Sequence, residues 1–145
     1  MRNPVVPKVA VQSAPFDVGI EIDRLISGRT DFGASVVFTG HCRDEGGRIA
    51  ALELEHYPGM AEKELERIAH EAAARWPIAG LTIMHRTGKV VPGEVIVVVI
   101  AIGEHRREAL KATEFIMDFL KTDAPFWKKE HLPDGTSTDW VAPKQ

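Results

Sequence analysis

Residues 95–102 read VIVVVIAI, which is the longest apolar run in the chain. A run of this length is typical of a strand that is buried on both faces, and it is far shorter than the roughly 20 residues of a membrane-spanning helix. Gly103 follows directly and allows a sharp turn. We therefore expect a central strand over residues 95–102 and then a helix over about residues 104–120, which Pro125 keeps from continuing. The inward positions of this helix are Ala109, Ala112, Thr113, Ile116 and Leu120.

The segments before this strand alternate between strand and helix patterns. β-Branched and apolar residues predict a strand over residues 34–39, and alternation predicts a half-buried strand over residues 50–56 that pairs with it. A short strand is expected over residues 81–85. Because no clean βαβ repeat is present, the pattern favours an α+β fold with a mainly antiparallel sheet.

Two further helices have recognisable ends. Asp17 is placed to cap a helix over residues 18–26. A second helix, over about residues 60–75, has to stop at the Trp-Pro pair 76–77, because the residue before a proline disfavours the α region. Alternation on both sides of the Pro-Asp-Gly sequence at 133–135 indicates a hairpin near the end of the chain.

The composition is that of a soluble globular protein. The length suits a single domain over residues 1–145, with residues 1–14 as an N-terminal arm or an edge strand. The chain is 44% hydrophobic and 27% charged, and its net charge of −3 argues against a broad nucleic-acid-binding surface. Cys42 is the only cysteine, so no internal disulfide can form. Prolines interrupt the N-terminal MRNPVVPKVA, and we expect a cytoplasmic protein with no membrane segment.

The first candidate site is the loop GHCRDEGGR at residues 40–48. Its glycines let the backbone approach a ligand closely. Arg43 offers a rigid fork of donors that suits a phosphate or carboxylate, and His41 and Cys42 lie beside it. Taken alone the signal is weak, because an arginine in such a loop is more often only solvated.

The second candidate is the turn GEHRR at residues 103–107. A buried strand leads there into a helix start, where free N–H groups and the helix dipole favour anions. His105 and Arg106 at that point indicate a phosphate or carboxylate site. The alternative is that these residues only cap and solubilise the first turn.

The third candidate is the stretch KTDAPFWKKE at residues 121–130. Phe126 and Trp127 indicate a wall for a flat ring, flanked by Lys121 and Lys128, although ordinary core packing is the expected role of at least one of them. A lysine near bound phosphate can also exchange a proton if its pKa is lowered. The same chain contains no HExxH, GxSxG or P-loop motif, and Cys42 has no cysteine partner, so no metal site is expected.

These segments resemble the large, catalytic subunits of molybdopterin synthases. The resemblance extends over about residues 16–141, and the sequences EHYPGM and APFWK in that order are highly specific. The matching stretches are Val37-Phe38-Thr39-Gly40 with Arg43, residues 54–60 with Glu62 and Lys63, Trp76-Pro77, His85-Arg86-Thr87-Gly88, Pro92-Gly93-Glu94, His105-Arg106, Phe115-Ile116-Met117-Asp118, Leu120-Lys121 and residues 124–130.

The resemblance implies an α/β-hammerhead fold with an additional antiparallel β subdomain. It implies a transferase of molybdenum cofactor biosynthesis that converts cyclic pyranopterin monophosphate to molybdopterin. The sulfur would come from a thiocarboxylate on the C-terminal Gly-Gly of a ubiquitin-like small subunit. It further implies a homodimer within a heterotetramer, and no metal or organic cofactor for the sulfur transfer.

The family's pocket residues fall on the same three segments. The chemistry of these side chains suggests their roles, as hypotheses. Lys121 and Lys128 would be catalytic residues at the reacting carbons and the thiocarboxylate. Arg43, His105 and Arg106 would hold the substrate phosphate. The full set of substrate-binding positions is His41, Cys42, Arg43, His105, Arg106, Lys121, Lys128, Lys129 and Glu130.

One departure from the family pattern bears on this set. Family members often carry Lys-Val where this chain has His41 and Cys42, so the phosphate contact at position 41 is the weakest of them. Two rival functions remain open: a non-catalytic module that binds a ubiquitin-like protein or a pterin, and a phosphate-ester hydrolase with His105 as its acid–base group. A nucleic-acid binder is disfavoured by the net charge.

Overall fold

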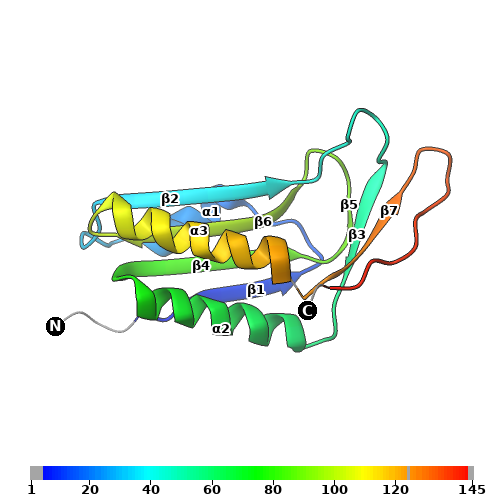
Figure 1. Cartoon of the computed structure of the whole chain (residues 1–145). Helices are drawn as coiled ribbons and strands as arrows, with labels where there is room; N and C mark the ends of the chain where they lie inside the picture. Colours follow the sequence, from blue (N-terminus) through cyan, green and yellow to red (C-terminus); the bar gives the residue numbers. More distant parts are fainter. Residues whose placement is uncertain (1–4, 124, 144–145) are drawn as a thin grey trace.

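Two β-sheets, packed at an angle to each other, form the frame of the protein (Figure 1). The computed structural model describes residues 5–123 and 125–143, so residues 1–4 of the expected arm and Ala124 of the third candidate segment lie outside the described residues. The elements are β1 (Lys8–Gln12), α1 (Val18–Ile26), β2 (Ala34–His41), β3 (Ala51–Glu55), α2 (Met60–Arg75), β4 (Ile78–Arg86), β5 (Gly88–Val90), β6 (Val95–Gly103), α3 (Arg106–Asp123) and β7 (Trp127–His131). The predicted α+β class is confirmed.

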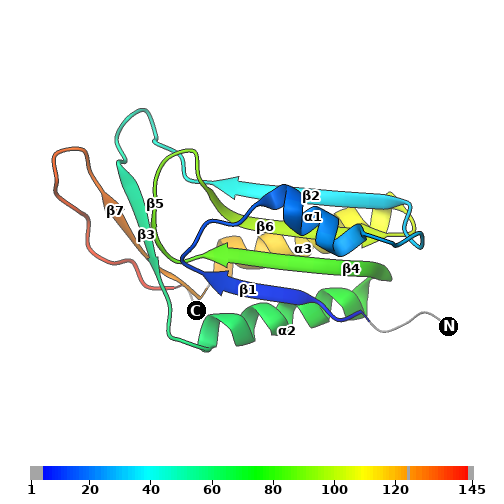
Figure 2. The same ribbon diagram turned by 180° about the vertical axis from the view of Figure 1, so that it is seen from behind.

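The larger sheet has the strand order β1-β4-β6-β2. The apolar run of β6 lies inside it and pairs antiparallel with both β2 and β4, while β1 runs parallel to β4 at one edge. The side chains of successive β6 residues point to opposite faces of the larger sheet. Val97, Val99 and Ala101 pack in the core beneath α2 and α3, whereas Val98 and Ile100 pack toward α1. Figures 1 and 2 show α2 and α3 on one face and α1 on the other.

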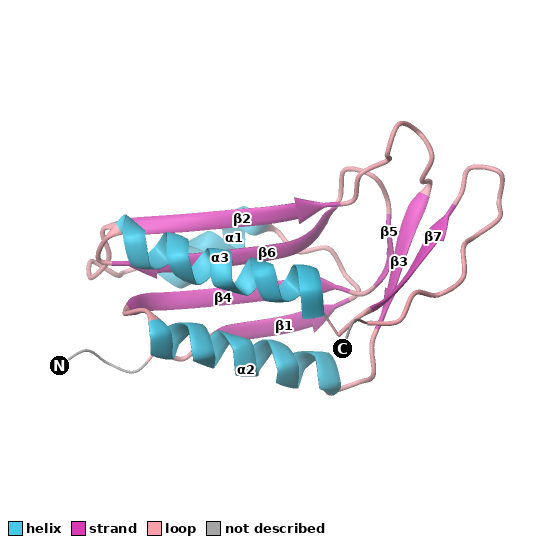
Figure 3. Ribbon diagram, in the orientation of Figure 1, coloured by secondary structure: helices cyan, strands magenta, loops and turns pink. Residues whose placement is uncertain are grey.

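The smaller sheet, of order β5-β3-β7, is antiparallel and lies at one end of the larger sheet (Figure 3). The chain turns back after β7, and isolated bridges join Lys128 to Val141 and His131 to Ser137. The expected terminal hairpin is therefore present, although its returning arm is held by single bridges. No helix within the described part of the chain combines the length and apolar content needed to cross a bilayer.

The predicted pairing of residues 34–39 with residues 50–56 is wrong. β2 pairs with β6 in the larger sheet, and β3 pairs with β5 and β7 in the smaller one. The loop between β2 and β3 is long enough to carry the chain from one sheet to the other, so neighbours in sequence need not become neighbours in a sheet. Local alternation shows which residues face a core, but it does not identify the strand partner.

Several predicted boundaries also move, and β4 (Ile78–Arg86) extends beyond both ends of the strand expected over residues 81–85. β2 continues through His41, so this residue belongs to a strand end and not to the loop. Helix α3 begins at Arg106, two residues later than expected, and ends at Asp123. The backbone N–H of His105 donates to Glu108 Oε1 at 2.9 Å, so the side chain of Glu108 caps the start of the helix.

Candidate functional site

A small buried cluster joins the two sheets and brings the first and third candidate segments together. Cys42, the residue directly after β2, packs in one cluster with Leu54, Val90 and Phe126. Arg43 follows Cys42 by one residue and Lys128 follows Phe126 by two. The Cα atom of each therefore lies within about 7 Å of the Cα atom of a residue in this cluster. The last turn of α3, which carries Lys121, ends beside the start of β7 (Figure 1).

Arg43, Lys121 and Lys128 are exposed cations. Among residues 5–123 and 125–143, no side-chain hydrogen bond or ion pair engages any of the three. The Lys128 ammonium is nonetheless close enough to the buried His85 ring to help lower its pKa. Three cations without a side-chain partner near one junction can attract an anion, because no ion pair has to be broken first.

His41 is less available than its neighbour. Its Nδ1 lies 3.0 Å from the carbonyl oxygen of Gly93, and its Nε2 lies 3.0 Å from Thr39 Oγ1. A carbonyl only accepts, so Nδ1 carries the proton, and a neutral ring then accepts from the threonine at Nε2. Both nitrogens are occupied, and no N–H of a neutral His41 is left for a phosphate.

Cys42 contributes packing and backbone contacts. Its side chain is buried, and this burial raises the pKa of the thiol, which favours the uncharged form. Its N–H donates to the Glu94 carbonyl at 2.9 Å, and its own carbonyl accepts from the Gly93 N–H at 2.8 Å. These bonds tie the end of β2 to the β5–β6 loop and hold Arg43 at the junction.

Strand β7 separates the residues of the third segment onto two faces. Phe126 is buried in the junction core, and alternation places Lys128 on the same face, opposite Leu54. Trp127 points to the other face, where it lines a cavity of about 320 Å³ together with Glu55, His56, Tyr57 and Trp140. The expected ring wall between Lys121 and Lys128 is therefore not built by Trp127, because neighbouring residues of a strand face opposite ways.

Lys129 and Glu130 are already engaged. The Lys129 ammonium lies 5.1 Å from the centre of the Trp140 ring, on the outer face. Glu130 accepts from Arg48 at 2.9 Å, and its backbone N–H donates to Thr138 Oγ1. Both side chains therefore already have partners, the Trp140 ring for Lys129 and Arg48 for Glu130.

The second candidate segment lies at the far end of the molecule. The rise of 1.5 Å per residue separates Arg106 from Lys121 by about 22 Å along the α3 axis. His105 and Arg106 are exposed, but the capping carboxylate of Glu108 shares the helix start with them and competes with an anion there. One protomer therefore does not bring this pair into contact with Arg43 or Lys128.

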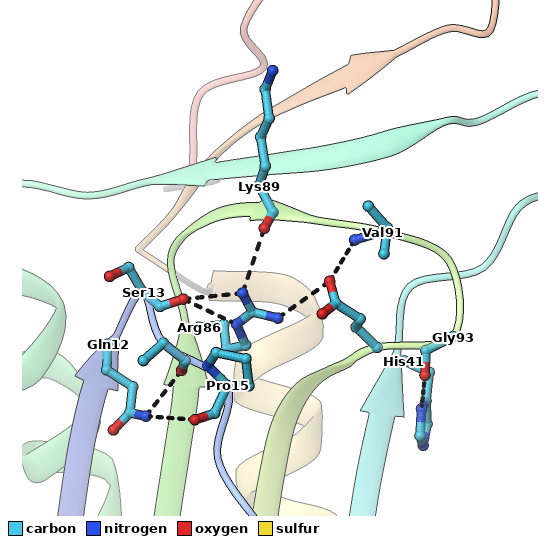
Figure 4. A network of polar contacts seen from close by, with 10 residues as sticks. Gln12, Ser13, Pro15, His41, Arg86, Lys89, Val91 and Gly93 are labelled. Carbon is cyan, nitrogen blue, oxygen red and sulfur yellow. Dashed lines mark hydrogen bonds and ion pairs between the residues drawn. The ribbon is translucent and has the colours of Figure 1, made fainter.

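The structure also reveals polar residues at the junction to which sequence reasoning gave no role. His85 is buried, and burial lowers its pKa to about 4, with Lys128 and His56 adding to the effect. Arg86 is buried next to it and contacts Glu94 and two backbone segments (Figure 4). In the sequence, only the family-like stretch at residues 85–88 drew attention to His85 and Arg86. Their burial could not be predicted, because it depends on the second sheet. No cluster of metal-binding side chains occurs among the described residues.

Comparison with known proteins gives a consistent result. A model of the MoaE protein family matches residues 11–123. The chain is 56% identical over 145 residues to the molybdopterin synthase catalytic subunit of Mesorhizobium japonicum, covering 100% of this chain and 91% of that relative. It is 56% identical over 137 residues to the protein of the same name from Brucella melitensis, covering 94% and 84%.

A solved structure extends this similarity to three dimensions. The molybdopterin biosynthesis MoaE protein from Burkholderia ambifaria superposes with a TM-score of 0.83 at 45% identity. The superposition covers 97% of this chain and 92% of that one. Both sheets are therefore part of a shared architecture.

Proposed function

This chain belongs to the MoaE protein family, and on that premise we propose that it is the catalytic subunit of a molybdopterin synthase in molybdenum cofactor biosynthesis. In this proposal it is a sulfurtransferase that converts cyclic pyranopterin monophosphate to molybdopterin. The sulfur comes from the thiocarboxylate at the C-terminal Gly-Gly of a ubiquitin-like small subunit. The protein supplies binding, orientation and proton transfer.

The observation that carries this proposal is the group of three uncommitted cations at the junction of the sheets. The substrate has a phosphate and the sulfur donor has a thiocarboxylate, so both reactants are anions that such a site attracts. The planar fork of Arg43 suits the phosphate, whereas the compact ammonium groups of Lys121 and Lys128 suit the thiocarboxylate and a proton shuttle. Holding two anions in one site lowers the repulsion between them, which is a direct contribution to the rate.

A second copy of the chain accounts for His105 and Arg106. Strand β2 is an edge of the larger sheet and exposes Val37 and Phe38. Its first residue, Ala34, pairs with Gly103, close to Arg106, and its last residue is His41. If two copies pair antiparallel along β2, their ends are exchanged, and Arg106 of the partner subunit comes to the Arg43 end of this one. We propose that the homodimer completes each site in this way.

Reconstitution tests the activity. Purified chain is mixed with cyclic pyranopterin monophosphate and a small subunit that carries the C-terminal thiocarboxylate, and dithiolene-pterin formation is followed. The matched control is the same small subunit with an ordinary carboxylate, which binds but has no sulfur to give. Product that depends on both the chain and the thiocarboxylate supports the proposal.

Two other results would contradict it. Tight association of the components with no product would favour the non-catalytic binding module. Release of inorganic phosphate from the substrate without sulfur incorporation would favour a phosphate-ester hydrolase.

A further inference from the structure

Arg86 is the last residue of β4, and its side chain is only 7% exposed. The guanidinium reaches three separate segments (Figure 4). Nη2 donates to the Ser13 carbonyl at 3.0 Å and, more weakly, to the Lys89 carbonyl at 3.5 Å. Nη1 forms an ion pair with Glu94 Oε1 at 3.4 Å. This single side chain therefore links the end of β1, strand β5 and the β5–β6 loop at the meeting point of the two sheets.

Glu94 connects Arg86 to Cys42, the residue that precedes Arg43. Its carboxylate also accepts from the Val91 N–H at 2.8 Å, which closes the β5–β6 loop. That hydrogen bond, with a smaller contribution from Arg86, lowers the pKa of Glu94 and keeps it charged. The backbone of Gly93 and Glu94 then holds Cys42 from both sides, through the two hydrogen bonds described above. Arg43 is the next residue along the chain.

The Arg86–Glu94 pair is buried on one side only. The Arg86 side chain is 7% exposed and the Glu94 side chain is 37% exposed. Nη1 of Arg86 is buried and has no hydrogen-bond partner among the described residues, so the ion pair with Glu94 is the contact that this nitrogen makes. Loss of Glu94 would leave the buried end of the guanidinium without that contact, which gives the pair a reason to stay together and to restrain the loop.

From this chain of contacts we infer that Arg86 and Glu94 are positioning residues, which hold the Arg43 loop of the larger sheet at a set distance from Lys128 on the smaller sheet. The inference rests on the proposed function, because it requires Arg43 and Lys128 to act on one substrate. Neither Arg86 nor Glu94 touches that substrate. They act through Gly93, Cys42 and the backbone that leads to Arg43.

The test compares three glutamine variants in the complete synthase: Arg86→Gln, Glu94→Gln and, as a matched control, Arg75→Gln. Arg75 also pairs with a glutamate and contacts an aromatic ring, but it lies at the end of α2. Glu94→Gln is the milder change, because an amide oxygen still accepts from Val91. Two quantities are measured: KM and kcat for the cyclic pterin in the complete synthase and, for the purified chain, the rate at which Cys42, its only cysteine, reacts with a soluble disulfide reagent.

We expect Arg86→Gln and Glu94→Gln to raise KM about tenfold with kcat at saturation within about twofold, since a displaced Arg43 weakens binding of the phosphate in ground state and transition state alike. The same variants should expose Cys42 and speed its reaction about fivefold, because the hydrogen bonds that bury it loosen. Arg75→Gln should change neither quantity.

The outcomes separate this inference from the function on which it rests. An active wild type with unchanged KM in the folded Glu94→Gln variant would overturn the positioning role and leave the function intact. A raised KM with unchanged Cys42 reactivity would also overturn it, because the effect would not pass through the loop. A wild type that makes no product would remove the proposed function and this inference together.

Discussion

The ring of His85 lies almost parallel to the ring of Phe126, with 3.9 Å between the ring centres and 12° between the planes. His85 Nδ1 lies 2.8 Å from the carbonyl oxygen of Arg86, so the buried imidazole is held by one polar and one stacking contact. Phe126 belongs to the junction cluster, and the Lys128 ammonium is near enough to the His85 ring to help lower its pKa. The burial of His85 makes the stability of the protein depend on pH.

Stability should fall in mild acid because of His85. Its pKa is about 4 in the folded protein and near 6.5 in the unfolded chain, so the unfolded chain binds the extra proton first. The contribution is fully present above about pH 6.5 and is lost progressively as the pH falls toward 4, with a total on the order of 3 kcal/mol. Urea unfolding between pH 4 and 7 measures it.

Two matched variants test whether His85 causes this pH dependence of stability. His85→Leu should flatten the curve over this range, whereas His70→Leu, at an exposed position on α2, should leave it unchanged. An unaltered slope in folded His85→Leu would show that another group is responsible.

Lys121 and Lys128 should be needed for turnover and not for folding. Each is exposed and makes no ion pair among the described residues, so replacing it with alanine should change the free energy of unfolding by less than about 0.5 kcal/mol. Product formation should drop at least about 100-fold, as expected when a group that shuttles protons at the reacting atoms is removed. The control is Lys111→Ala, an exposed lysine on the same helix. Near-normal turnover by either variant would exclude that lysine from the mechanism.

Arg43 and His41 should differ in their effect on substrate binding. Arg43→Ala removes an uncommitted guanidinium and should raise KM for the cyclic pterin by roughly 10- to 100-fold, the value of one or two charge-assisted hydrogen bonds. His41→Ala removes a ring whose nitrogens already contact Gly93 and Thr39, and should raise KM by less than about threefold. Equal effects in steady-state kinetics would mean that His41 leaves these partners when the substrate binds.

A shared site predicts complementation between inactive variants. Assayed at substrate concentrations below the KM of the wild type, Arg106→Ala and Lys128→Ala should each have little activity alone. After subunit exchange, half of the dimers contain one copy of each variant, and each such dimer has one intact site, so about a quarter of wild-type activity should return. Mixing Lys121→Ala with Lys128→Ala is the control, because both residues belong to the same end of one chain and no site is restored. Absence of recovery in the first mixture would show that Arg106 serves a different role.

The sequence predicted those parts of the fold that depend on local patterns. The helix at residues 18–26 has its Asp17 cap, with the carboxylate accepting from Ile20 N–H at 3.1 Å. The second helix spans Met60–Arg75. It could be predicted because both signals for it, the apolar spacing and the proline at 77, lie within one short segment. The central strand over residues 95–102 could also be predicted from the sequence, since a continuous apolar run leaves no exposed face.

The candidate site was only partly recoverable. Residue chemistry pointed to the segments of Arg43, Lys121 and Lys128 only weakly, and the family resemblance supported the choice of these three residues. Residue chemistry also indicated His105 and Arg106, which the single protomer places about 22 Å away along α3. It missed Arg86 and Glu94, whose roles come from burial and from partners at distant positions in the chain.

By itself, the sequence determined the three helices, the longer strands and their apolar faces, because each of these follows from side chains a few positions apart. The tertiary structure alone decided that β2 and β3 belong to different sheets, that Trp127 and Lys128 face opposite ways relative to the junction, and that His85 is buried and neutral. These outcomes depend on which distant segments pack together. That choice is made by the free energy of the whole core and not by any one stretch of the chain.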